Sequence, residues 1–334
     1  MKISTVLTAL QIGFLLACSV EADSLEWFKP SLPSVPPDRC CGSIAYDTAT
    51  ETVVLFGGGN GCAYPAYRYN DTWVFSAKTG WSQIFPATSP SPRQGAGMAY
   101  DPTTGTVLLF GGFDVNDVDL NDTWTWDGTT WTQQFPPVSP PAREIDTQGL
   151  THDPLTGTVL MFGGFDGTNS TVKPLQDTWE WNGKTKTWTQ KFPALSPPAS
   201  SPTLAYDARH GNVLLFAGNG TASEPLNQTW SWNGTTWTQL FPEATPSPRA
   251  LNSMAYDFTI GYVVLFGGIA GNQVLDDTWI WSGSTWVQTQ TPYQPGQRYS
   301  SAMAVEPYLG GLILFGGIRE DNVFLNQTWV FSLL

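Results

Sequence analysis

Five arginines recur along the chain, and their side chains could bind an anion. They are Arg39, Arg93, Arg143, Arg249 and Arg298. A guanidinium group matches the geometry of a carboxylate. Several of them around one opening of a central channel would therefore suit an acidic sugar, a carboxylate or an acidic peptide. In the alternative interpretation, each arginine bonds loop carbonyls and holds neighbouring segments together. The recurrence favours that structural role, but the five remain the best binding candidates.

The spacing around Arg143 differs from that of the other four arginines. Each of those lies eight residues before an acidic residue, whereas Arg143 lies ten residues before Asp153. The difference predicts a small bulge or insertion, which also holds the acidic pair Glu144 and Asp146. Two carboxylates beside an arginine could serve acid–base chemistry, but they more often form a salt bridge. No catalytic residue is assigned on this basis.

The candidate metal ligands form no recognised motif. His152 and His210 are the only histidines, and neither has metal-ligand spacing, so both are predicted to be surface or packed residues. Asp117, Asp119 and Asn121 are spaced as in a calcium loop, but the glycine expected next is missing. No CxxC pair supports a zinc site. We therefore expect neither a metal nor a cofactor.

Cysteines and tyrosines gather in one part of the sequence. In an exported protein, one disulfide is expected between Cys62 and either Cys40 or Cys41, and a vicinal bond between Cys40 and Cys41 is less favoured. Tyr64 and Tyr67 lie in the adjoining variable segment. Variable loops often carry specificity, so these two tyrosines are further binding candidates.

A repeated unit accounts for most of the sequence and must position these residues. An apolar run ending in Gly-Gly or Ala-Gly recurs six times, with its last glycine at 58, 112, 164, 218, 268 and 317. The resulting period of 49 to 54 residues is typical of propeller blades. Within residues 95–135, four short strands are predicted at 95–100, 106–112, 122–126 and 131–135. The repeat predicts an all-β, six-bladed propeller with four antiparallel strands per blade.

The tryptophans follow the same repeat. All of them except Trp27 occupy two positions of the third predicted strand or one position of the fourth. Aromatic residues at i and i+2 share one face of a strand and can pack on the next blade, which favours a core role over sugar-binding platforms. The sixth unit ends after its third strand, and residues 25–30 have the pattern of the fourth. The N-terminal segment is therefore predicted to complete the last blade and close the ring.

These units resemble the kelch family. The resemblance rests on the Gly-Gly pairs, on the tryptophans at 73, 124, 179, 230, 279 and 329, and on a second tryptophan about seven residues later. It covers nearly all of the chain after residue 22, and departs at Ala217 and at residues 151–153. It implies the propeller fold, but kelch propellers include binding scaffolds, ligand adaptors and a few enzymes. Kelch-like copper oxidases such as galactose oxidase need two histidine ligands, tyrosine ligands and a Tyr–Cys cross-link. That site cannot be assembled here, because His152 and His210 are predicted at one rim of the propeller and the cysteines at the other.

Residues 1–22 are predicted to be a signal peptide. Lys2 precedes a largely apolar stretch, and small residues end at Ala22. In an alternative, residues 15–18 form a lipobox and Cys18 is lipidated. The propeller would then occupy residues 23–334 of a secreted or lipid-anchored, extracytoplasmic protein. The net charge of −13 argues against nucleic acid and anionic lipid as partners, and no other segment could cross a bilayer.

The functional expectation is a monomeric, non-enzymatic binding module. It would present the arginines and the loops after the second strands to a protein or a glycan. One alternative is a carbohydrate enzyme resembling the kelch-type sialic-acid mutarotases, and another is a purely structural surface protein. A deep pocket joining Glu144 or Asp146 to several arginines would favour the enzyme. A flat or plugged rim would favour binding or structure.

Overall fold

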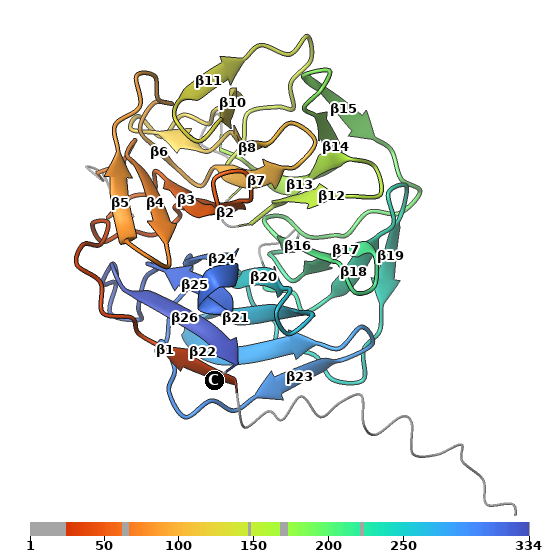
Figure 1. Cartoon of the computed structure of the whole chain (residues 1–334). Helices are drawn as coiled ribbons and strands as arrows, with labels where there is room; N and C mark the ends of the chain where they lie inside the picture. Colours follow the sequence, from red (N-terminus) through yellow and green to blue (C-terminus); the bar gives the residue numbers. More distant parts are fainter. Residues whose placement is uncertain (1–24, 62–66, 146–147, 168–172, 221–223, 334) are drawn as a thin grey trace, which may run out of the picture.

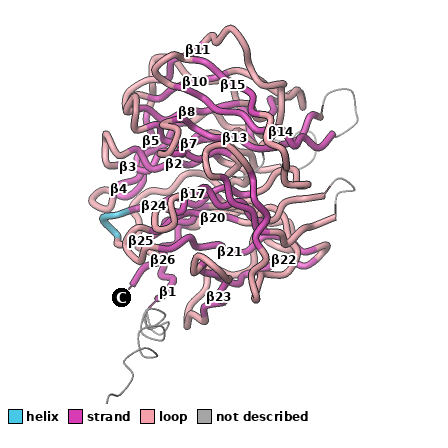
Figure 2. Tube along the Cα trace, turned by 90° about the vertical axis from the view of Figure 1, so that its right-hand side faces the viewer, coloured by secondary structure: helices cyan, strands magenta, loops and turns pink. Residues whose placement is uncertain are grey.

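Six antiparallel sheets are arranged around a common centre as the blades of a propeller (Figure 1). The computed structural model describes residues 25–61, 67–145, 148–167, 173–220 and 224–333. Each blade has four strands, which are called A to D from the centre outward. Apart from the short 3-10 helix η3 (Pro307–Leu309), the elements drawn in Figure 2 are strands and loops. The predicted fold class is confirmed.

The strands are as follows, from blade 1 to blade 6. The A strands are β2 (Ser43–Asp47), β7 (Gly97–Asp101), β12 (Leu150–Asp153), β16 (Thr203–Asp207), β20 (Ser253–Asp257) and β24 (Ala302–Glu306). The B strands are β3 (Thr52–Phe56), β8 (Thr106–Phe110), β13 (Thr158–Asp166), β17 (Asn212–Phe216), β21 (Tyr262–Ala270) and β25 (Gly311–Phe315). The C strands are β4 (Thr72–Ser76), β10 (Thr123–Trp126), β14 (Lys173–Asn182), β18 (Thr229–Trp232), β22 (Gln273–Trp281) and β26 (Thr328–Leu333). The D strands are β5 (Gly80–Ile84), β11 (Trp131–Gln134), β15 (Thr187–Lys191), β19 (Trp237–Leu240), β23 (Trp286–Thr289) and β1 (Leu25–Phe28). A separate pair, β6 (Arg93–Gln94) and β9 (Phe113–Asp114), links two loops.

In blades 1, 2, 4 and 6, strand B ends before the Gly-Gly or Ala-Gly pair, whereas in blades 3 and 5 it continues through the pair with a shift in register. Gly111 and Gly112 have φ angles of 69° and 84°, a region that L side chains rarely adopt. A Cβ on Gly111 would lie 2.7 Å from the carbonyl oxygen of Arg143, in the link that enters blade 3. The pair therefore lets the chain leave the sheet beside the next blade.

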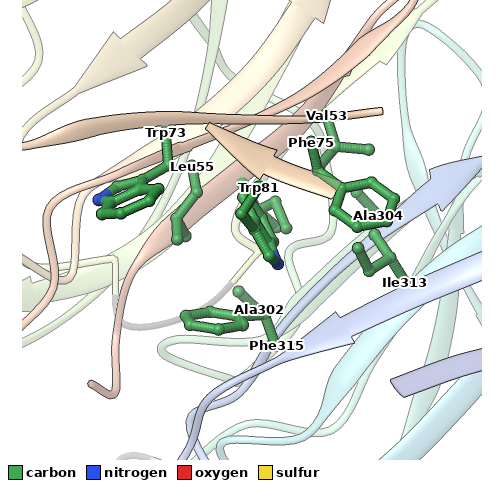
Figure 3. Packing of buried hydrophobic residues seen from close by; sticks show 10 residues of the cluster. Val53, Leu55, Trp73, Phe75, Trp81, Ala302, Ala304, Ile313 and Phe315 are labelled. Carbon is green, nitrogen blue, oxygen red and sulfur yellow. The ribbon is translucent and has the colours of Figure 1, made fainter. Parts of the chain in front are cut away.

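The hydrophobic core is divided among the boundaries between neighbouring blades. Figure 3 shows the boundary between blades 1 and 6, where Trp81 of β5 lies between Phe75 of its own blade and Phe315 of β25. Both ring-centroid distances are 5.2 Å. Strand B contributes to the boundary on each side, which explains why its apolar residues do not alternate with polar ones.

A hydrogen bond from each D-strand tryptophan crosses to the preceding blade. In blade 2, the Trp131 indole N–H donates to the hydroxyl of Thr72 in β4 at 2.9 Å. In blade 6, Trp27 donates to Thr278 in the same way, also at 2.9 Å. Strand β1 pairs antiparallel with β26 from Leu25 to Phe28. The N-terminal segment thus completes the last blade, as predicted.

Candidate functional site

The five predicted arginines lie inside the propeller, with side chains only 0–1% exposed. In blade 1, Arg39 donates to both carboxylate oxygens of Asp71, at 2.7 and 2.8 Å, and to the carbonyl oxygen of Gly57 at 2.8 Å. Asp71 also accepts the indole N–H of Trp73 at 2.7 Å. The equivalent ion pairs are Arg93–Asp122, Arg143–Asp177 and Arg249–Asp277.

These contacts bind the arginine side chains to their own blades, while their backbones reach the preceding blade. The Arg39 N–H donates to the Leu325 carbonyl, and the Arg39 carbonyl accepts the N–H of Gly317. Both partners belong to blade 6. This is the structural role considered above for the arginines, and it leaves their guanidinium groups unavailable to a ligand at the surface.

Three of these paired carboxylates are stabilised in the charged form. Burial raises the pKa of Asp122, Asp177 and Asp277, but the hydrogen bonds and charge of the arginine beside each one outweigh burial. Each pKa therefore lies below its usual value. Charge neutralisation within the pair is what makes a buried guanidinium tolerable here.

Two blades depart from this pattern. In blade 6, Arg298 bonds to the side-chain oxygen of Gln327 at 3.0 Å, where blades 1, 2, 3 and 5 have aspartate. Burial, followed by the charge of Arg319, lowers the pKa of Arg298 to about 10. In blade 4, Ala199 replaces the arginine and Gln228 replaces the aspartate. The aspartate is therefore present only in blades that also have the arginine.

The loops after the B strands share one face of the propeller with the links from D to A, and we call this the loop face. On it, Tyr67 is 64% exposed and contacts Tyr69 edge-on, with ring centroids 4.8 Å apart. Arg68 lies over the Phe113 ring at 4.3 Å and also bonds to Asp117, so it joins the first such loop to the second. Tyr64 lies outside the described residues.

The predicted disulfide cannot be followed to both of its ends. Cys40 and Cys41 are buried, and their sulfur atoms lie 3.1 Å apart. A disulfide bond is about 2.05 Å long, so no vicinal bond is formed. Cys62 lies outside the described residues, so its pairing with one of them stays a prediction.

The extra residues after Arg143 place a glutamine across the central channel. The Gln148 side-chain oxygen accepts the Met254 N–H at 2.8 Å, and the side-chain amide donates to the Met303 carbonyl. The backbone carbonyl of Gln148 accepts the Leu204 N–H at 2.8 Å. One residue of blade 3 thereby contacts blades 4, 5 and 6. The ten-residue spacing indicated an insertion but not this plug.

Of the acidic pair in the insertion, Glu144 lies in the part of the chain that the structure describes. Glu144 forms a β-bridge with Phe165, and its side chain lies over Gly95, where a Cβ would be 2.7 Å from the Glu144 Cγ. Asp146 lies outside the described residues.

The channel opens on the opposite side, among the turns that join strands A and B, which we call the turn face. A cavity of about 430 Å³ lies there, and its lining includes the next-to-last residue of each A strand. These six residues are Tyr46, Tyr100, His152, Tyr206, Tyr256 and Val305. Burial lowers the pKa of His152, against the smaller opposing effect of Asp101 and Asp153, so the imidazole is neutral at neutral pH. His210 instead bonds to Asp207, at 2.7 Å.

Four phenylalanines that follow D strands are almost fully exposed, at 83–84%. They are Phe85, Phe135, Phe192 and Phe241, each followed by proline. In blade 2, Trp131 is 1% exposed, and Phe135 four residues later is 83% exposed. Because D strands end toward the loop face, these rings stand at its outer edge. Their exposure was missed because the sequence pattern does not separate them from the buried aromatic residues.

Within the described ranges, no group of three or more histidine, cysteine, aspartate or glutamate side chains could hold a metal ion. No helix in that part of the chain is long and apolar enough to span a membrane.

The comparison with known families agrees with this geometry. The model of the KLHDC2/KLHL20/DRC7 Kelch-repeats domain matches residues 16–199 and, in a second match, residues 157–334. Together the two matches extend over all six blades. The kelch propeller fold suggests a protein-interaction module. The chain therefore belongs to the kelch-repeat family.

Proposed function

We propose that this chain is an extracytoplasmic protein-binding module whose partner docks on the loop face. The observation that carries the proposal is the set of four exposed phenylalanines at equivalent blade positions. An exposed phenylalanine adds little to the stability of its own chain, whereas aromatic side chains are enriched in the buried centres of protein interfaces. Tyr67 adds a further exposed ring on the same face.

Location outside the cytoplasm is supported by the sequence of residues 1–22. The described fold begins with β1 at Leu25, so cleavage after Ala22 would leave the closing strand intact. Cleavage before Cys18, followed by lipidation, would leave it intact as well. Mass spectrometry of the mature protein separates these outcomes. A first residue of Asp23 supports secretion and a lipidated Cys18 supports an envelope anchor, whereas an unprocessed chain confined to the cytoplasm contradicts the proposal.

The binding proposal can be tested with paired variants. The mature chain and a Phe135→Ser, Phe192→Ser double variant are immobilised and exposed to envelope and extracellular fractions of the source organism. A partner identified with the wild type is then purified and its affinity is measured. We expect the double variant to lose at least tenfold in affinity, because two exposed aromatic contacts are removed without disturbing the core.

Tyr256→Val on the turn face is the control and should leave the affinity unchanged. Equal binding by the wild type and the double variant would show that the loop face is not the docking surface. A glycan that binds, and that loses affinity in the double variant, would keep the face but replace the protein partner.

A further inference from the structure

The cavity on the turn face is a pocket that the proposed docking does not use. Its volume of about 430 Å³ lies in the range of small-molecule sites. Gln148 lines its inner end, with both polar atoms of its side chain bonded to the backbone of Met254 and Met303.

The wall of this pocket is aromatic at the mouth and carries no ionic side chain. Tyr46, Tyr100, Tyr206 and Tyr256 line it and are half-buried, and Phe258 adds a further ring. No lysine, arginine, aspartate or glutamate is among the described residues that line it. The faces of aromatic rings carry partial negative charge and attract cations.

A ring of buried carboxylates surrounds this aromatic wall. The residue after each tyrosine position ends strand A and is acidic in every blade: Asp47, Asp101, Asp153, Asp207, Asp257 and Glu306. All six are at most 1% exposed. One oxygen of each accepts a backbone N–H of the following turn; for example, Asp257 accepts from Thr259 at 2.9 Å. The second oxygens of Asp47 and Asp257 have no partner among the described residues.

Few positive charges oppose this ring. The Arg209 guanidinium lies over Tyr262, and its charge also acts on the Tyr256 hydroxyl. The pocket therefore lies in a region of net negative charge, while its own surface is uncharged. The surrounding carboxylates would repel an anion, and the pocket lining offers no positive charge to offset the cost of removing it from water.

We propose that this pocket binds a small organic cation with a quaternary ammonium head. Such a head has a dispersed positive charge, which suits the tyrosine faces and the surrounding carboxylates. It has no N–H donor, so it needs no hydrogen-bond acceptor from carboxylates that already hold the turns. Its methyl groups match the apolar alanine and methionine side chains deeper in the cavity.

A matched set of three soluble compounds tests the charge requirement. Choline carries the cation, 3,3-dimethylbutan-1-ol is its uncharged carbon isostere, and glycine betaine adds a carboxylate. Isothermal titration calorimetry at low salt should show choline binding at least fivefold more tightly than the alcohol and than betaine. The preference should weaken as salt is added, because salt screens the carboxylate ring. Equal affinity for choline and the alcohol, or no choline binding at 50 mM, which is about the weakest affinity a site of this kind would have, would overturn the proposal.

Two substitutions localise the binding. Tyr256→Val removes one ring, and Val305 at the equivalent position of blade 6 shows that strand A accepts valine there. Asp257→Asn removes one charge and keeps the oxygen that accepts the Thr259 N–H. Each should weaken choline at least threefold, and Asp257→Asn should leave the alcohol unchanged. Tyr67→Val, on the loop face, is the control, and thermal melts report whether each variant folds. Folded Tyr256→Val and Asp257→Asn proteins that both bind choline as the wild type does would refute the assignment.

Discussion

The aspartate immediately before strand C accepts hydrogen bonds from two different side chains. Asp71 accepts from the guanidinium of Arg39 and from the indole of Trp73, so one carboxylate fixes an inner link and an outer strand. The recurrence of the arginines was visible in the sequence. Their burial was not, because the aspartates that neutralise them lie 28 to 34 residues further along the chain.

Replacing Gln327 with aspartate should stabilise the protein. The buried Arg298 would gain the carboxylate that its counterparts have, worth about 1–2 kcal/mol in the free energy of unfolding. Urea denaturation measures the difference. Gln228→Asp is the matched control: blade 4 has Ala199 and no arginine, so the new charge should cost about 1–3 kcal/mol. Similar effects at the two sites would show that charge pairing does not govern this position.

Ala217 offers a second test at this scale. It occupies the first position of a Gly-Gly pair with a φ angle of 60°, which is strained for a residue with a Cβ. Ala217→Gly should therefore raise the free energy of unfolding by about 1 kcal/mol. Ala205→Gly, within strand β16, should lower stability instead. A loss of stability in Ala217→Gly would mean that packing of the methyl group outweighs backbone strain.

His152 makes stability depend on pH. Its pKa in the folded protein is below the ordinary value of 6.5, because burial disfavours the imidazolium. As pH falls through 6.5, the unfolded chain takes up a proton that the folded chain does not, so the folded state loses stability. In His152→Tyr, which carries the residue of four other blades, this loss should be absent. Chemical denaturation should show that the free energy of unfolding of the variant exceeds that of the wild type by a larger amount at pH 5.5 than at pH 7.5. A constant gap would contradict the assignment.

Among the elements, β1 has the greatest consequence for the fold. Trp27 has no exposed surface, packs against Phe266 and Phe331, and bonds to Thr278 across the blade boundary. The strand could be predicted from the sequence because the repeat has one vacant position and Trp27 fits it. The position of Gln148 in the channel could not be predicted, since no pattern showed that this side chain and backbone would reach three other blades.

Trp27→Ala should lower the free energy of unfolding by about 3–5 kcal/mol, the usual cost of deleting a buried tryptophan. Removal of residues 23–30 should destabilise the fold further, because β26 would become an open edge. Glu26→Ala, on the less buried face of β1, is the control and should change stability by less than about 0.5 kcal/mol. An unchanged melting temperature in the truncated chain would show that the ring does not depend on β1.

The whole molecule has two faces of different character. Exposed phenylalanines edge the loop face, and tyrosines backed by buried carboxylates surround the mouth of the turn face. Periodicity predicted the six blades because each unit repeats the residues that pack against its neighbours. It could not separate the faces, because Trp131 and Phe135 are both repeated aromatic residues and only one of them lies against another blade.

Closure by β1 also sets the order in which the protein can be completed. Leu25 pairs with Leu333, so β1, the first strand to leave the ribosome or a translocation channel, cannot pair until β26, the last strand, has also emerged. Contacts between such distant parts of a chain form slowly, since the ends must first meet. Until then, five blades can assemble while the sixth stays unfinished. An exported chain of this design would remain incompletely folded during transit and would become a closed ring only after its final residues had crossed.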